Sequence, residues 1–416
     1  MRARNVAFAI CISLLYGCTQ EAATEWTPDG VAVDQQQVSS TAVAAFGDAL
    51  PGLTADELAL FQQGKEAFEE TEGVADGLGP VFNEDSCVAC HAGPETGGSN
   101  GRLETRFGRR NQIRVFSRLK IVFDPLEALG GSLLQDHGIG EVPGHVFAAE
   151  AVPLKANVVA SRRTTPLFGL GLVDATPDDQ IRSIASWQAR NAPDVAGTIA
   201  VVDDLFTGRR SVGKFGWKSQ NPTLLQFSGD AYLNEMGITS PKFPDENCPQ
   251  GDCTTLAFNP RPDLNDADGA DVQAFADFMT LLAPPPRADG TFQSRTGESI
   301  FRSIGCALCH VPTLVTGRNA VQALNQVAYH PYSDFLLHDM GSLGDGIEQG
   351  PAGARQMRTA PLWGLRVAPS LLHDGRAATP RDAILAHDGQ GRRARNRFAS
   401  LDARSQAALL AFLETL

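Results

Sequence analysis

The sequence contains the stretch Cys87-Val88-Ala89-Cys90-His91, and the same pattern returns as Cys306-Ala307-Leu308-Cys309-His310. Two thiols three positions apart can lie on one face of a helical turn and bond to both vinyl groups of one haem. The histidine that follows can then direct a ring nitrogen to the haem iron. Two such motifs predict two covalently bound c-type haems. The predicted attachment sites are Cys87, Cys90, Cys306 and Cys309, and the predicted iron ligands are His91 and His310.

Other uses of the cysteines fit less well. A zinc site needs four ligands, and neither motif has an evident fourth ligand in its local sequence. A thioredoxin-like dithiol would lie in a β-α-β unit, which the flanking sequence does not suggest. The last pair, Cys248 and Cys253, has no histidine after it. A local disulfide that closes this turn is the preferred interpretation.

Composition limits the classes of partner. The chain has 416 residues, with 35 Lys and Arg against 48 Asp and Glu, a formal net charge of −13. Its length suffices for more than one domain. No basic face offsets phosphate repulsion, so we expect no nucleic-acid partner. The acidic balance suits docking to a basic redox protein, such as a basic cytochrome.

The N-terminal segment predicts export. Arg2 and Arg4 precede the apolar run 6–15, which is too short to span a bilayer as a permanent helix. The run ends in Leu15-Tyr16-Gly17-Cys18, which resembles a bacterial lipoprotein cleavage box; export without lipidation is the alternative. We therefore expect a lipoprotein-type signal over 1–18, a flexible tether over 19–55, and a periplasmic protein anchored to the membrane through a lipid on Cys18.

A second repeat follows the two haem motifs. Arg163-Thr164-Thr165-Pro166-Leu167-Phe168-Gly169-Leu170 recurs as Arg358-Thr359-Ala360-Pro361-Leu362-Trp363-Gly364-Leu365. Segments repeated at a similar place after each motif indicate a duplicated domain. We predict two cytochrome-c-like domains with facing haems, joined at Pro284-Pro285-Pro286. The N-terminal haem domain, with insertions, is expected over 56–286, and the C-terminal haem domain over 287–416.

Periodicity predicts helices more often than strands. Apolar residues recur at helical spacing over 272–279 and 407–413, and 292–304 has the pattern of a helix leading into the second motif. Alternation typical of strands is sparse. The predicted fold class is mainly α, with two packed cytochrome-c-like domains, long irregular loops and little β structure.

Taken together, these segments resemble a known family. The chain is similar to the bacterial di-haem oxidoreductases, also labelled thiol oxidoreductases. More distantly it is similar to di-haem cytochrome c peroxidases and to the di-haem enzyme that matures methylamine dehydrogenase. The resemblance implies that electrons pass from the C-terminal haem to a catalytic N-terminal haem. The matching segments are 82–91, 165–172, 215–239, 305–314, 331–341 and 372–376.

The resemblance also implies a sixth ligand for the C-terminal haem. In the similar peroxidases, a methionine that ligates the electron-transfer haem stands fourteen residues after the histidine of a His-Asp-Gly segment. Here His387 stands fourteen residues after His373. His387 would then face His310, and a bis-His haem has a lower potential than a His/Met haem. Met340 is the alternative ligand and would give the opposite potential; His387 could also be a surface residue.

The catalytic residues follow from the same comparison. Glu235 stands seventeen residues after Lys218, the offset of the catalytic glutamate in the similar peroxidases, which implies a general acid/base. Peroxide cleavage needs such a group to move a proton between the two oxygens. An exposed glutamate at a helix end is the alternative. Trp217 falls in the segment equivalent to the inter-haem region and is the candidate electron relay, with Trp363 second; a buried core tryptophan is the alternative.

The N-terminal iron is expected to have an open position. The similar peroxidases carry a distal histidine in a Leu-Glu-Thr-containing segment, and here Arg109 stands near its place. His137 or His145 could still supply a ligand. The acidic stretch 265–271 could bind calcium, which related enzymes hold between their haems, or form a solvated turn.

The predicted function is therefore a periplasmic di-haem c-type oxidoreductase that reduces peroxide. Its partners would be peroxide and a redox protein. Two alternatives remain: an electron-transfer cytochrome without catalysis, and an oxidase of a thiol or of a protein side chain.

Overall fold

The computed structural model describes residues 44–115, 118–261 and 266–416. The predicted signal segment 1–18, with Cys18, and most of the predicted tether 19–55 lie outside these residues. Within the tether, Leu50 is buried and its backbone N–H donates to the carbonyl oxygen of Leu281 at 2.7 Å. The end of that segment therefore packs against the body of the protein.

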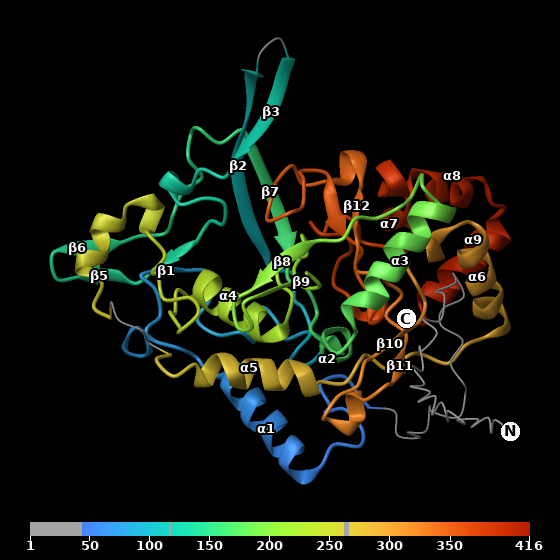
Figure 1. Ribbon diagram of the computed structural model, residues 1–416, viewed down its shortest axis with the longest axis horizontal. Helices are drawn as coiled ribbons and strands as arrows, with labels where there is room; N and C mark the ends of the chain where they lie inside the picture. Colours follow the sequence, from blue (N-terminus) through green and yellow to red (C-terminus); the bar gives the residue numbers. More distant parts are fainter. Residues whose placement is uncertain (1–43, 116–117, 262–265) are drawn as a thin grey trace, which may run out of the picture.

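Helices form the framework of both halves of the chain (Figure 1). The regions predicted as helices around 272–279, 292–304 and 407–413 are helical. The α-helices of the described residues are α1 (Ala55–Glu69), α2 (Leu170–Asp174), α3 (Asp178–Asn191), α4 (Leu224–Met236), α5 (Ala270–Leu281), α6 (Phe292–Ser303), α7 (Pro380–Ala386), α8 (Arg392–Ser400) and α9 (Ala403–Leu413).

The two halves use corresponding helix pairs. α1 packs against α5 in the first half, and α6 packs against α9 in the second (Figure 1). Each crossing occurs at a glycine, because a Cβ on Gly64 or Gly297 would lie 2.4 or 1.9 Å from a backbone oxygen of the partner helix. The hydroxyls of Thr54 and Thr291 cap α1 and α6 by accepting a backbone N–H from the first turn. This correspondence agrees with a duplicated origin.

The strands are short and antiparallel in every pairing of the described residues. A three-stranded sheet has the order β3-β2-β7, and the remaining sheets are two-stranded, β1-β4, β5-β6, β8-β9, β10-β11 and β12-β13. The strands are β1 (Val81–Phe82), β2 (Leu103–Val115), β3 (Arg118–Asp124), β4 (His137–Gly138), β5 (Gly140–Val142), β6 (His145–Phe147), β7 (Val158–Arg163), β8 (Val201–Asp204), β9 (Arg209–Val212), β10 (Leu314–Val315), β11 (Ala328–Tyr329), β12 (Leu337–Asp339) and β13 (Gln356–Arg358).

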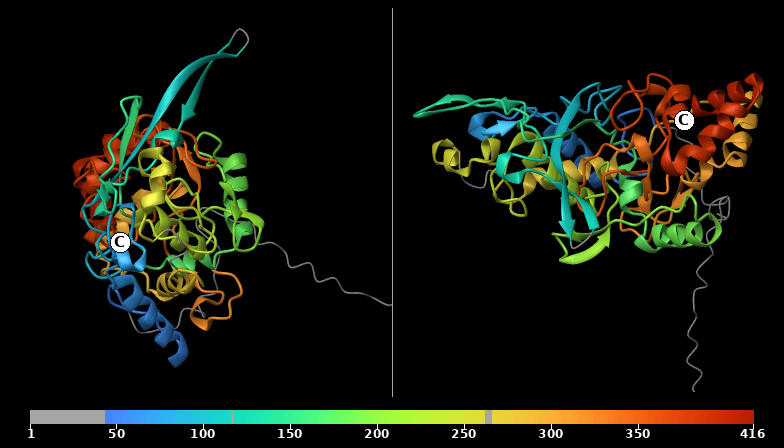
Figure 2. Two further views of the ribbon diagram at one scale, coloured as in Figure 1. Left: turned by 90° about the vertical axis from the view of Figure 1, so that its left-hand side faces the viewer. Right: turned by 90° about the horizontal axis from the view of Figure 1, so that it is seen from above.

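The prediction of a mainly α fold with little β structure is wrong. Helices account for 35% of the chain and strands for 18%, in several small sheets. Most of these strands have two to four residues, too few to show a period-2 pattern in the sequence. β2 is long enough, but arginines interrupt its apolar alternation at Arg106, Arg109, Arg110 and Arg114. Beyond Phe107, which is fully buried, β2 and β3 leave the body as a projecting ribbon (Figures 1 and 2).

Two apolar cores hold the body together. The larger core extends from Leu50 to Trp363 and joins the two halves of the chain, with Phe68, Phe275 and Phe278 packed together between α1 and α5. The smaller core fills the space among α6, α8 and α9. The predicted boundary at 284–286 falls between α5 and α6. None of the helices described here is long and apolar enough to cross a membrane.

Two candidate haem sites

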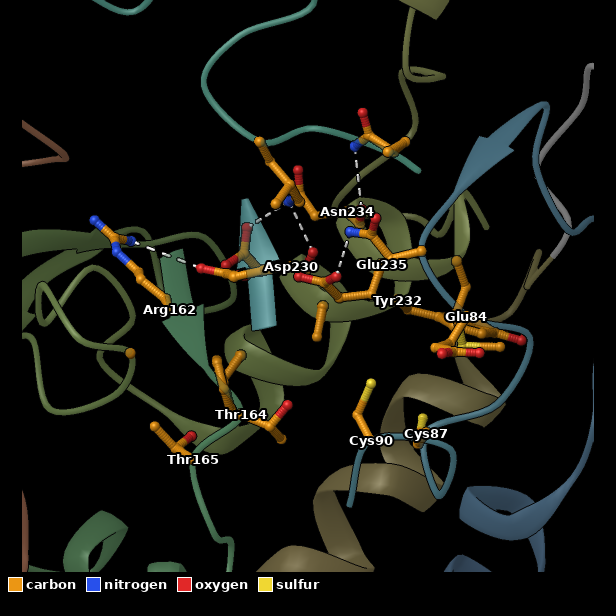
Figure 3. A pocket seen from close by; sticks show the side chains of 18 of the residues that line it. Glu84, Cys87, Cys90, Arg162, Thr164, Thr165, Asp230, Tyr232, Asn234 and Glu235 are labelled. Atoms are coloured by element: carbon orange, nitrogen blue, oxygen red, sulfur yellow. Dashed lines mark hydrogen bonds and ion pairs between the residues drawn. The ribbon is translucent and has the colours of Figure 1, made fainter. Parts of the chain in front are cut away.

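The first Cys-x-x-Cys-His motif lies in a cavity of about 590 Å³, here called the N-terminal cavity. Its wall is built by α1, the motif loop, β2, α4 and α5. Figure 3 shows Cys87 and Cys90 below Glu235, with the Cys90 thiol pointing into the space between them. The motif and the predicted catalytic residue therefore share one cavity.

The side chain of His91 is oriented for a metal bond. Its Nδ1 donates to the carbonyl oxygen of Gly98 at 3.1 Å, and the backbone of Thr165 also contacts the imidazole. With Nδ1 as the N–H donor, Nε2 is the nitrogen available to a metal. Burial lowers the pKa of His91 to about 4, which keeps the imidazole neutral. The ring of Phe68 lies edge-on to it at 5.9 Å. A neutral histidine held by a backbone carbonyl is the usual form of a metal-ligating histidine.

Glu235 is half-buried at the end of α4, where it lines the cavity, and has two polar partners. Asn83 Nδ2 donates to its Oε2 at 2.7 Å, and its carboxyl group shares a hydrogen bond with Glu104 of β2. The backbone N–H of Asn83 also donates to the carbonyl oxygen of Glu235 at 2.7 Å, which ties the loop after β1 to this helix end. The alternative of an exposed glutamate is thereby removed.

The surroundings raise the pKa of Glu235 and lower the pKa of Glu104. Burial and the charge of Glu104 raise the pKa of Glu235 to about 7. Burial also opposes ionisation of Glu104, but Arg106 and then Arg162 outweigh it and hold its pKa below the usual range. Arg106 Nε lies 2.9 Å from Glu104 Oε1. Glu235 is therefore the group of the pair that gains and loses a proton near neutral pH, while Glu104 stays ionised.

The second motif lies in a separate cavity of about 400 Å³, here called the C-terminal cavity. Most of its wall is apolar and comes from α3, α6, α7 and α9. The apolar lining residues include Trp187, Phe301, Ile304, Leu365, Leu371, Leu372, Ile384, Leu409 and Leu413. No carboxylate pair comparable to Glu235 and Glu104 lines it within the described residues.

Two histidines lie close together at the wall of this cavity. The ring centres of His310 and His387 are 6.4 Å apart. Each ring is anchored through Nδ1, to the carbonyl oxygen of Tyr332 at 3.0 Å for His310 and of Ala383 at 2.7 Å for His387. Both Nε2 atoms therefore remain as acceptors. Burial lowers the pKa of both histidines, that of His310 to about 4.

The other candidates in this cavity have different surroundings. Met340 follows β12 and also lines the cavity, so it remains the rival ligand. His338 is buried with its Nε2 3.0 Å from Asp334 Oδ2 and its Nδ1 3.6 Å from Cys309 Sγ. Both ring nitrogens of His338 are thus engaged by protein groups.

Trp217 lies between the two cavities, because it lines both of them. Its indole Nε1 donates to the carbonyl oxygen of Arg163 at 2.9 Å, and its ring meets His373 edge-on at 6.2 Å. Arg163 also lines both cavities. Trp363, the second relay candidate, packs in the larger core against Tyr329.

Both cavities fit a haem bound through its motif. Each is lined by two free thiols and one neutral, oriented histidine. Two metal–imidazole bonds of about 2 Å, plus roughly 1 Å from each nitrogen to its ring centre, span about 6 Å, close to the separation of His310 and His387. In addition, Nε of the buried Arg163 has no hydrogen-bond partner, as expected beside an anionic group. The donor set and the unpaired cation therefore suit an iron porphyrin.

A family model described as "Di-haem oxidoreductase, putative peroxidase" matches residues 152–416. The chain belongs to the di-haem oxidoreductase family. No curated protein matches the chain. Among solved structures, a MauG-like protein associated with microbial copper homeostasis is 15% identical, with a TM-score of 0.40 over 91% of this chain and 95% of that chain. The diheme peroxidase BthA from Burkholderia thailandensis is 15% identical, with a TM-score of 0.38 over 86% of both chains.

Three predicted residues of this di-haem oxidoreductase are not among those that line the N-terminal cavity. Arg109 is exposed on β2. His137 stacks on Phe82, and His145 stacks on Phe258. His91 is the one histidine that lines this cavity among the described residues.

The sequence comparison missed the acid/base partner. In the similar peroxidases the Leu-Glu-Thr segment carries a distal histidine, which this chain lacks. Here Glu104 and Arg106 of that segment line the cavity. The signal was present in the alternation of β2, which directs residues 104 and 106 to one face of the strand. Their contact with Glu235 depends on the approach of β2 to α4, which no local pattern encodes.

Two further expectations concern loops of this oxidoreductase. Cys248 and Cys253 form a disulfide, as predicted. Of the acidic stretch 265–271, Asn265 lies outside the described residues. Asp266 is buried and accepts the backbone N–H groups of Asp271 and Val272 at the start of α5. This carboxylate therefore caps a helix, and a calcium site here stays a prediction.

Proposed function

We propose that this di-haem oxidoreductase is a c-type peroxidase. Its haems would be attached through Cys87 and Cys90 and through Cys306 and Cys309, with peroxide reduced in the N-terminal cavity. The observation that carries the proposal is the carboxyl pair of Glu235 and Glu104, which lines the same cavity as the first motif. An electron carrier has no use for a proton donor and acceptor beside an iron site.

The bound haem would supply the iron at which the peroxide O–O bond is cleaved. The protein's part is to move one proton. In its ionised form, Glu235 would accept a proton from one peroxide oxygen and return it to the other, which leaves as water. Asn83 fixes the orientation of its carboxyl group. Glu104, held ionised by Arg106, sets the pKa of Glu235 near neutrality.

The C-terminal cavity suits electron storage. His310 and His387 would both hold the iron of its haem, since their ring centres are 6.4 Å apart and each ring is anchored through Nδ1. A filled sixth position favours electron transfer over chemistry. Electrons would pass from this haem to the N-terminal haem by way of Trp217, the aromatic side chain that lines both cavities.

The cellular setting follows from the sequence. Covalent haem motifs and the export segment 1–18 support a periplasmic enzyme, anchored by a lipid on Cys18. A separate redox protein would deliver electrons to the C-terminal haem. The overall charge of −13 favours a basic donor.

Rapid mixing of the fully reduced holoprotein with hydrogen peroxide tests this function. A peroxidase takes two electrons per peroxide, so one equivalent should oxidise both haems and form water. Each haem is followed by its absorbance, and the remaining peroxide is assayed separately. Slow oxidation without this stoichiometry would show an electron carrier in place of a peroxidase.

A further inference from the structure

The repeated segments that begin with Arg163 and Arg358 have no role in the function proposed above. Each arginine is the last residue of a strand, β7 for Arg163 and β13 for Arg358. Both are buried, with 9% and 7% of their surface exposed. The duplication has thus placed a buried cation at the same point of each half.

Neither guanidinium forms an ion pair with a carboxylate in the part of the chain that the structure describes. Asp334, which is paired with His338, acts on Arg358 only through its charge. Arg163 makes one long hydrogen bond, from Nη1 to Ser99 Oγ at 3.4 Å, and its Nε has no partner. Arg358 donates to two backbone carbonyl oxygens, those of Gly216 and Thr359. A guanidinium has five N–H donors and is always charged. Burial of such a group without an anion is strongly unfavourable.

Arg162, the residue next to Arg163, is also buried but does have a carboxylate partner. Its guanidinium lies 2.7 Å from Asp345 Oδ2, and Lys218 lies 2.8 Å from the other oxygen of the same carboxylate. Where a buried cation serves the protein alone, the chain supplies a carboxylate. Arg163 and Arg358 are left for an anion that comes from outside the chain.

Both side chains border the cavities. Arg163 lines the N-terminal and the C-terminal cavity, and Arg358 lines the C-terminal cavity. A haem carries two propionate carboxylates at one edge, and a guanidinium binds a carboxylate through two parallel hydrogen bonds. Burial lowers the pKa of each arginine to about 10, which still leaves both charged at neutral pH.

We propose that Arg163 and Arg358 are the counter-ions of the haem carboxylates, with Arg163 shared between the two haems and Arg358 serving the C-terminal haem. The proposal rests on haem occupancy of both cavities, which is part of the proposed function, but not on peroxide as the substrate. A cation beside a haem favours the reduced iron, which carries one positive charge less. Arg163 therefore raises the potential of both haems together.

Redox titration of the holoprotein tests the assignment without any peroxide. R163Q should lower the potentials of both haems, and R358Q should lower that of the C-terminal haem only. R163K keeps the charge and should stay close to the wild type in potential. R210Q, at a surface position, is the control and should shift neither haem.

Haem content is measured on the same samples, so that a variant that fails to bind haem is distinguished from one with a changed potential. A loss of bound haem in R163Q that R163K restores would also support the assignment. Full haem content with unchanged potentials in R163Q would overturn it. So would an equal fall of both potentials in R163K and R163Q, because charge would then not be the cause. Failure of the peroxide experiment would leave these outcomes unaffected.

Discussion

The N-terminal and C-terminal cavities share a thiol pair and a histidine anchored to a backbone carbonyl, but their opposite walls differ. In the N-terminal cavity that wall carries Glu235, Glu104 and Arg106. In the C-terminal cavity it carries a second anchored histidine, His387, among apolar side chains. A duplicated scaffold thus offers one site with groups that move protons and one site with a second nitrogen ligand.

The comparison separates features that both halves share from residues that differ between the two cavities. The helix crossings at Gly64 and Gly297 and the buried arginines are repeated in both halves. The residues across the cavity come from unmatched elements, β2 and α4 in one half and the turn after α7 in the other. The two cavities can therefore take different tasks while each keeps a thiol pair and an anchored histidine.

The largest effect is expected from Glu235→Gln, which removes the proton acceptor of the N-terminal cavity. Peroxide turnover should fall by about 10²- to 10⁴-fold, the usual contribution of a general acid/base. The absorption spectra of both haems should remain unchanged. Glu246→Gln is the matched control, since Glu246 is another carboxyl group at the wall of the same cavity. Equal losses in the two variants would remove the role assigned to Glu235.

Substitution of His387 tests the other cavity. His387→Met should raise the potential of one haem by on the order of 0.1 V, within the ~0.8 V span that axial ligands cover. A potentiometric titration followed by absorbance separates the two haems. Met340→Leu should leave both potentials in place. If Met340→Leu shifts a potential and His387→Met does not, Met340 is the ligand.

The pH profile sharpens the comparison, because a proton acceptor is assigned to one cavity alone. Glu235 acts as a base in its ionised form, and its pKa is raised to about 7. The rate of peroxide reduction should therefore increase as pH rises through about 7. Glu104→Gln removes a negative charge that raises this pKa, so the midpoint should move to lower pH. An unchanged midpoint would show that the two carboxyl groups do not interact.

The smallest effect is expected at the boundary between the cavities. Trp217→Phe keeps an aromatic ring but leaves the carbonyl oxygen of Arg163 without its donor, at a cost of about 1 kcal/mol in the free energy of unfolding. Electron transfer between the haems should slow while both potentials stay constant. Trp363→Phe, in the larger core, should not change that rate. Flash reduction of the C-terminal haem measures it.

Local patterns in the sequence predicted the parts of the fold that depend on neighbouring residues. The motifs at 87–91 and 306–310, the helices α5, α6 and α9, and the disulfide of Cys248 and Cys253 all follow from short spacings. The small sheets were missed, because strands of two to four residues form where distant loops meet and carry no period of their own. β2 was not predicted as a strand, because its arginines interrupt the apolar alternation.

Some residues of the candidate site could likewise be predicted from the sequence, and others could not. Glu235 and His387 were predicted from fixed offsets and Trp217 from its segment, and the structure brings each to a motif-bearing cavity. Glu104, Arg106 and the missing counter-ions of Arg163 and Arg358 could not be predicted. Their importance depends on burial and on which charges lie nearby after folding, and neither is a property of the local sequence.

The spin state of the two ferric haems tests the central claim most directly. Electron paramagnetic resonance of the oxidised holoprotein should show one high-spin haem, from the N-terminal cavity with its single histidine. It should also show one low-spin haem, from His310 and His387 in the C-terminal cavity. Cyanide should convert only the high-spin signal. Two low-spin haems that do not respond to cyanide would contradict the division of labour between the cavities.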